Sequence, residues 1–163
     1  MDFDWLFAIK AGITATLMTL SAVWGWLGWL IIVWVCAMAL DYCTGTLAAM
    51  RKGKWRSKVA RDGLFRKAGE ILIVLVGAIG DGVLATIVYH IPAVEFSYPS
   101  TGLLLPLVVV WYTITEMGSI VENAELLGAT IPAWLAKILQ LSKSAVDNAG
   151  EALTGGHTDE TEL

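Results

Sequence analysis

Residues 11–40 read AGITATLMTLSAVWGWLGWLIIVWVCAMAL, and none of these thirty side chains is charged. A bilayer core about 30 Å thick is crossed by roughly 20 apolar residues in an α-helix. A second uncharged run covers residues 96–115. The whole chain is 56% hydrophobic and 16% charged, too little polar surface for a small water-soluble domain. We therefore expect an all-α integral membrane protein, because the runs lack the alternation of β-barrel strands.

The first run is too long for one straight span. As a single helix, residues 11–40 would extend over about 45 Å. At its centre, residues 24–29 read WGWLGW, and glycines among tryptophans are typical of a tight turn at a membrane interface. This pattern favours a hairpin of two helices, over residues 5–23 and 29–50. A single tilted helix with an amphipathic N-terminal arm is the alternative.

Three further segments follow. Apolar runs predict helices over 69–91, which stops before a proline, and over 102–121. The chain is therefore expected to form helical hairpins with three to four membrane-spanning helices, of which four is favoured. Residues 132–147 have an apolar face and a polar face and predict an amphipathic helix, either on the membrane surface or against a partner helix. It closes a transmembrane domain of residues 1–149, and the acidic, glycine-containing tail 150–163 is expected to be disordered.

Positive charge is concentrated between the second and third expected helices. Lys and Arg accumulate in short cytoplasmic loops of membrane proteins. The segment 51–67 is therefore predicted to be a cytoplasmic loop in contact with anionic lipids, and the segment 92–101, without Lys or Arg, an external one. A loop between two spans argues against nucleic-acid binding. Eight of the eleven basic residues form the segment: Arg51, Lys52, Lys54, Arg56, Lys58, Arg61, Arg66 and Lys67.

Three acidic residues, Asp41, Asp81 and Glu116, lie inside expected spans. An ionised side chain at mid-bilayer costs at least about 2.5–3.5 kcal/mol, so such residues face protein or water. Small or polar residues recur at helical spacing around each of them, and small residues let helices approach closely. These faces either pack within one subunit or line an oligomer and its lumen. The candidates are Ala37, Asp41, Gly45 and Ala49; Gly77, Asp81 and Ala85; and Tyr112, Glu116, Ser119 and Asn123.

Catalysis is not indicated by these residues. Intramembrane aspartyl proteases use Tyr-Asp and Gly-x-Gly-Asp, whereas this chain has Asp41-Tyr42 and the sequence AIGD ending at Asp81. Ser and Thr are present in the spans, but we recognise no nucleophile–base arrangement with His or Lys there. His90 and His157 lack further ligand-type neighbours. We therefore predict no enzyme, no cofactor and no metal site.

Several motifs, in order, resemble the phage holins of the toxin-secretion and phage-lysis type, over roughly residues 27–140. The stretch LDYCTGTLAAM is followed by GKWRSKVARDGLFRKAGEILIVLVGAIGD, and YTITEMGSIVENAELLGATIPAWL comes later. In the first two stretches the positions similar to the family are Asp41, Tyr42, Thr44, Gly45, Ser57, Gly63, Arg66, Lys67 and Asp81. In the third they are Tyr112, Glu116, Ser119, Ile120, Glu122, Asn123, Gly128, Ile131, Pro132 and Leu135.

The resemblance implies a multi-pass protein of the bacterial cytoplasmic membrane that forms homo-oligomers. It implies timed lesions that release an endolysin, or a large toxin, for host lysis. The acidic stripes would then face the subunit interior first and a lumen after assembly. From the residues alone, a small ion channel or transporter subunit and a structural membrane protein remain alternatives.

Overall fold

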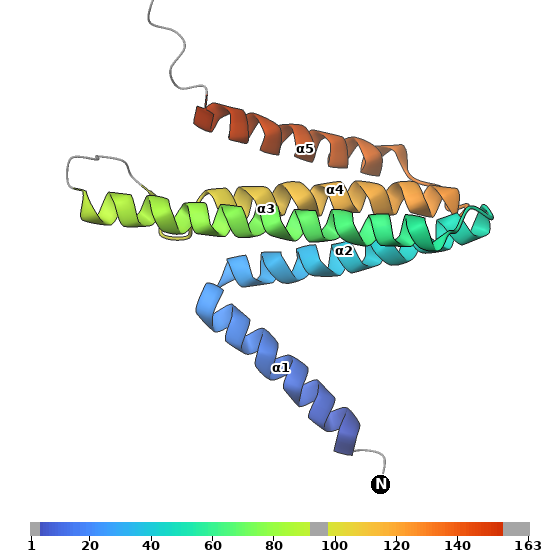
Figure 1. Cartoon of the computed structure of the whole chain (residues 1–163), viewed down its shortest axis with the longest axis horizontal. Coiled ribbons are helices and arrows are strands. Elements are labelled where there is room, and N and C mark those ends of the chain that lie inside the picture. Colours follow the sequence, from blue (N-terminus) through green and yellow to red (C-terminus); the bar gives the residue numbers. More distant parts are fainter. Residues whose placement is uncertain (1–3, 92–97, 155–163) are drawn as a thin grey trace, which may run out of the picture.

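The computed structural model describes residues 4–91 and 98–154, and within them every regular element is an α-helix. The expected all-α fold is confirmed. The helices, shown in Figure 1, are α1 (Asp4–Trp24), α2 (Trp26–Arg51), α3 (Ser57–His90), α4 (Leu104–Leu126) and α5 (Ala133–Thr154).

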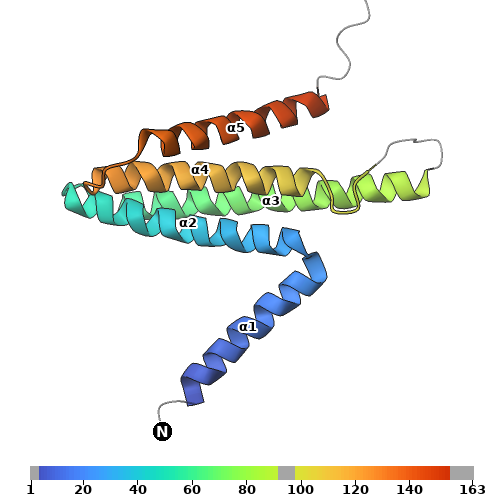
Figure 2. The ribbon, with the colours of Figure 1, turned by 180° about the vertical axis from the view of Figure 1, so that it is seen from behind.

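The break inside the first apolar run falls at Gly25. Its φ of 55° lies in the left-handed region, which glycine adopts without a Cβ clash. The turn expected from the WGWLGW motif is thus confirmed, although α2 begins at Trp26 and not at residue 29. Beyond this break α1 points away from the other helices (Figures 1 and 2).

Three helices of the described part are long and apolar enough to cross a membrane: α2, residues 60–90 of α3, and α4. Three spans is the lower end of the expected range of three to four. The fourth span, expected over residues 5–23 and corresponding to α1, stays a prediction.

Helix α4 is the centre of the bundle, because α2, α3 and α5 all pack on it while α2 and α3 meet only over a short stretch. Figures 1 and 2 show α2 and α4 running in one direction and α3 in the other. The buried core joins Trp34 and Met38 of α2 to Val74 of α3 and Val109 of α4. Most other large apolar side chains are exposed, as expected of helices that face lipid.

A close approach of α3 and α4 depends on Gly77. A Cβ built there would lie 3.3 Å from the Cα of Leu105. This is tighter than ordinary van der Waals contact, so the missing side chain allows the two backbones to meet. The small-residue face predicted around Gly77 is therefore a contact surface within the subunit.

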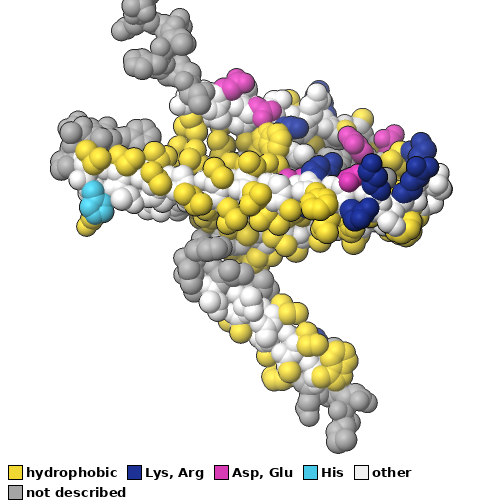
Figure 3. Space-filling model, in the orientation of Figure 1, with side chains coloured by type: hydrophobic (Ala, Val, Ile, Leu, Met, Phe, Trp, Pro, Cys, Tyr) yellow, Lys and Arg dark blue, Asp and Glu magenta, His cyan; other side chains and the backbone are white. Residues whose placement is uncertain are grey.

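The basic segment is not the loop that we expected over 51–67. Only residues 52–56 separate α2 from α3, and the rest is helical. Lys, Arg, Ala and Leu are strong helix formers, and a five-residue connection is enough to reverse the chain. Figure 3 shows the Lys and Arg side chains gathered at the end of the bundle where α2 meets α3.

The amphipathic helix expected over 132–147 is α5, which extends to Thr154 and packs along α4. Trp111 of α4 donates a hydrogen bond to Asp147 at 2.7 Å, and the Lys143 ammonium lies 4.9 Å from the centre of the Trp111 ring. The first five residues of the expected disordered tail are therefore helical. Residues 155–163 lie outside the described part.

Candidate functional site

Five charged side chains meet where α2, α3 and α4 come together, and we call them the buried charge cluster: Asp41, Arg66, Lys67, Glu70 and Glu116. The Lys67 ammonium lies 2.8 Å from Asp41, donates a hydrogen bond to Glu116 and lies 3.7 Å from Glu70. Arg66 lies at the rim, 3.7 Å from both Asp41 and Glu70. Both cations therefore come from α3, and they neutralise the acids of α2 and α4.

Burial makes these contacts strong. Glu116 is 2% exposed, Asp41 5% and Lys67 7%. In such surroundings an unpaired charge is far more costly than in water, so Asp41 and Glu116 depend on the ammonium of Lys67 that they share. Asn123 completes the coordination of Asp41 by donating a hydrogen bond of 3.1 Å. The cluster can thus fasten α2 and α3 to α4 inside one subunit.

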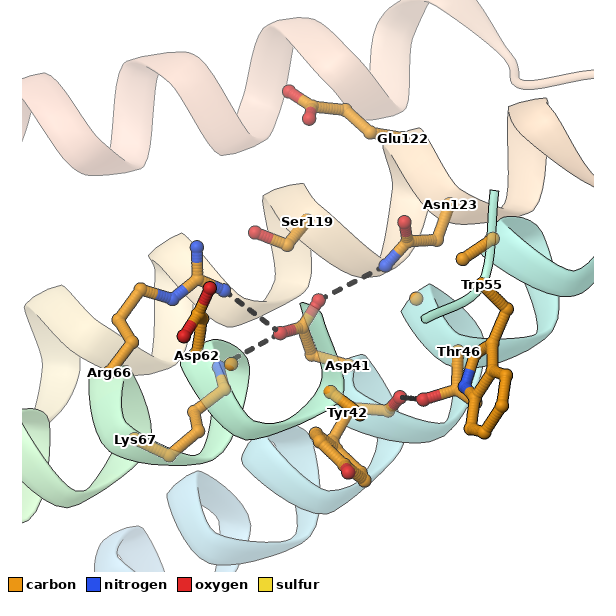
Figure 4. Close-up of a pocket in the computed structure, with 14 residues that line it drawn as sticks. Asp41, Tyr42, Thr46, Trp55, Asp62, Arg66, Lys67, Ser119, Glu122 and Asn123 are labelled. Carbon is orange, nitrogen blue, oxygen red and sulfur yellow. Dashed lines mark hydrogen bonds and ion pairs between the residues drawn. The ribbon is translucent and has the colours of Figure 1, made fainter. Parts of the chain in front are cut away.

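An open groove of about 550 Å³ lies beside the cluster (Figure 4). Its walls come from α2, α3 and α4, and Trp55 of the short connection lies at one edge. Asp41 points into it between Lys67, Arg66 and Asn123. Two further acids, Asp62 and Glu122, line the groove and are exposed.

The third intramembrane acid, Asp81, lies outside the buried charge cluster and binds backbone groups. Its two carboxylate oxygens accept hydrogen bonds from the backbone N–H groups of Leu103, Leu104 and Leu105 at 3.1, 2.7 and 2.9 Å, and from the Tyr98 hydroxyl. The first N–H groups of a helix lack partners within that helix and carry partial positive charge. Asp81 of α3 therefore caps the N-terminus of α4 from outside, which accounts for an acid in this position.

The hydroxyl of Tyr98 is held in its neutral form. Burial, and then the hydrogen bond to Asp81, raise the pKa of Tyr98 to about 12. A raised pKa in the folded state adds stability that is present below the ordinary tyrosine value of about 10 and is lost as pH rises through about 12. We expect the absorbance difference between the native protein and Tyr98→Phe to show phenolate only near pH 12. A phenolate signal from this residue near pH 10 would contradict the contact.

The structure brings most of the predicted site residues together. Asp41, Gly45, Ala49, Ser119 and Asn123 line the groove, and Glu116 lies in the cluster. The Tyr112 ring lies 6.4 Å from that of Trp34, and Ala37 is buried. Ala85 lines a separate pocket beside Asp81 and Tyr98. These contacts all lie within one subunit, so a lumen role for the same faces stays a prediction.

Among the basic residues, Lys67 departs from expectation. It was expected in an exposed loop, whereas its side chain is buried in the cluster. The other seven basic residues of the segment are exposed. Glu70, Asp62, Trp55 and Tyr98 were not among the sequence candidates. A signal for Glu70 did exist, since it stands one helical turn after Lys67 at the start of an apolar run.

Gly45 offers a direct test of packing within the subunit. A Cβ at Gly45 would lie 3.4 Å from the Asn123 amide nitrogen, so Gly45→Leu should displace Asn123 from Asp41 and lower the amount of folded, inserted protein at least several-fold. Ala39→Leu on the exposed side of α2 is the matched control and should leave the amount unchanged. Quantitative blotting of membranes measures both. Normal amounts of Gly45→Leu, with lost oligomers, would instead place this face between subunits.

The region that contains these sites is similar to known proteins. The sequence model of the bacteriophage holin family matches residues 18–144, which include the cluster, the groove and the Asp81 cap. An uncharacterized protein of Halalkalibacterium halodurans is 28% identical over 114 residues, which cover 70% of this chain and 78% of that protein. No solved structure matches the chain significantly.

Proposed function

Because the chain belongs to the bacteriophage holin family, whose members are non-enzymatic proteins of the cytoplasmic membrane, we propose that it oligomerises in that membrane and opens timed lesions. Through these lesions an endolysin reaches the peptidoglycan, or a large toxin leaves the cell. The observation that carries the proposal is the family match over most of the chain, joined to three helices able to cross a membrane.

The buried charge cluster supports the proposal because it explains how the protein can first accumulate in an inactive form. In the single subunit it satisfies Asp41, Lys67 and Glu116 internally, so the protein can accumulate without exposing charge to lipid. Opening a lesion requires polar faces that can meet water. Lys67 and Glu116 could do so only after α3 moves away from α4, so their contact would stabilise the inactive state.

The orientation that we propose follows from the charge distribution. The basic end of the bundle faces the cytoplasm, and the connection that includes Ser100 faces outward. Cysteines introduced at Lys54 and Ser100, with Cys36 and Cys43 replaced by alanine, should react with an impermeant maleimide from opposite sides. Reaction of both from the outside would overturn this orientation.

The function is tested by inducing the protein in a bacterium with and without a matched endolysin. We expect sudden loss of viability and entry of a large dye in both cultures, and lysis only with the endolysin. Passage of ions without entry of the large dye would favour a small channel. Unchanged viability and dye exclusion would overturn the proposal.

A further inference from the structure

The groove beside the buried charge cluster offers a mixed set of charges at the polar end of the bundle. It lies between α2 and α3, with α4 as its floor, next to the connection that holds Trp55. Tryptophan is enriched where a membrane meets water, and the Trp55 side chain is half exposed there. We therefore expect this open groove of about 550 Å³ to lie at the level of the lipid headgroups.

Arg66 lines this groove, and its guanidinium has no short hydrogen bond to an acid. Its side chain is 66% exposed, and its two ion contacts, to Asp41 and Glu70, are both 3.7 Å long. Those lengths exceed a direct hydrogen bond, so the guanidinium retains most of its five N–H donors. Arginine donors match phosphate oxygens in pairs, and a phosphodiester is the headgroup element that fits here.

Asp62 and Glu122 supply the two carboxylates in the groove that other side chains do not neutralise. Both are exposed and line the groove, and neither has an ion pair or hydrogen bond with another residue of the described part. Asp41 differs, because Lys67 and Asn123 already satisfy it. Free carboxylates repel a purely anionic headgroup but accept hydrogen bonds from a primary ammonium.

We propose that this groove binds the headgroup of phosphatidylethanolamine, with Arg66 on the phosphodiester and with Asp62 and Glu122 on the ammonium. The lipid carries one negative and one positive group in a short headgroup, and the groove presents the opposite charges. Phosphatidylcholine has the same net charge but no N–H to donate, and phosphatidylglycerol has no cation. Binding of this headgroup requires only the inserted protein and does not depend on lesion formation.

The test uses full-length protein purified in detergent and mixed with one lipid at a time, and retained lipid is counted by native mass spectrometry. We expect phosphatidylethanolamine to be retained at least roughly tenfold better than phosphatidylcholine or phosphatidylglycerol, since charge-assisted hydrogen bonds distinguish them. Equal retention of phosphatidylethanolamine and phosphatidylcholine, or stronger retention of phosphatidylglycerol, would overturn the proposal.

Two variants, one single and one double, locate the site. Arg66→Gln should weaken retention of phosphatidylethanolamine, and Asp62→Asn with Glu122→Gln should abolish its advantage over phosphatidylcholine. Exposed residues outside the groove provide matched controls: Arg61→Gln for the cation and Glu125→Gln for the acids. Circular dichroism confirms that each variant is helical. An equal effect of the control variants would show a general charge effect and no site.

Discussion

Replacing Lys67 with methionine is expected to destabilise the folded protein by roughly 3–5 kcal/mol, the usual cost of removing one partner from a buried ion pair. Lys67 is the buried cation in the described part of the chain. Its loss leaves Glu116 without a neutralising charge and leaves Asp41 with only the exposed Arg66 at 3.7 Å. Methionine has a similar length and no charge, so packing changes little. The measurement is the thermal midpoint in detergent, followed by size-exclusion chromatography.

Two further variants distinguish the effect of the lost charge from the effect of changed packing. Lys58→Met removes an exposed cation from the same helix and should shift the midpoint little. Adding Asp41→Asn and Glu116→Gln to Lys67→Met removes the unpaired charges and should restore much of the loss. If the triple variant is as unstable as Lys67→Met alone, the lysine acts through packing and not through neutralisation.

Asp81→Ala is the second change with a large expected effect. It leaves three backbone N–H groups at the start of α4 without their acceptor and removes the partner of Tyr98. Losing a cap costs about 0.5–2 kcal/mol, and a buried group left unpaired costs about 1–3 kcal/mol. Because the four groups are only partly buried, water can replace the carboxylate at most of them, and we expect roughly 2–4 kcal/mol in total. Asp81→Asn keeps a single acceptor oxygen and should lose about half as much.

Hydrogen exchange gives this prediction a local readout. The amides of residues 103–105 should exchange much faster in Asp81→Ala, while those around Lys67 keep their protection. Gly82→Ala is the neighbouring control, because a Cβ there meets open space. Unchanged exchange at residues 103–105 would show that the acid does not hold this helix end.

Much of the fold followed from local pattern. Uncharged runs, glycines among tryptophans and an amphipathic period predicted the helices and the break at Gly25. Helix ends were less accurate. Helix α3 begins at Ser57, twelve residues before the expected start at residue 69, because basic residues continue a helix readily. Hydropathy marks where a helix meets lipid, and not where it begins.

The site was harder to predict for a physical reason. Sequence shows that an acid inside a span needs a partner, but not which partner, because Asp41 and Lys67 come together only through the tertiary fold. For Asp81 no sequence motif could name the partners, since they are backbone N–H groups that every residue carries. Lys67 was placed with its exposed neighbours, although Glu70 and the apolar run after it marked a helix that continues inward.

The three segments that can cross a membrane differ in length. The 26 residues of α2, the 31 residues from Ala60 to His90 of α3 and the 23 residues of α4 measure about 39, 46 and 34 Å. A hydrocarbon layer of about 30 Å is shorter than all three, so the helices must tilt or extend into the headgroup region, α3 most of all. Any remaining hydrophobic mismatch costs fractions of a kcal/mol per Å, and neighbouring subunits that shared one deformed region of bilayer would reduce its perimeter. Such deformation would favour association of subunits without any contact between their side chains, and more strongly in thinner membranes.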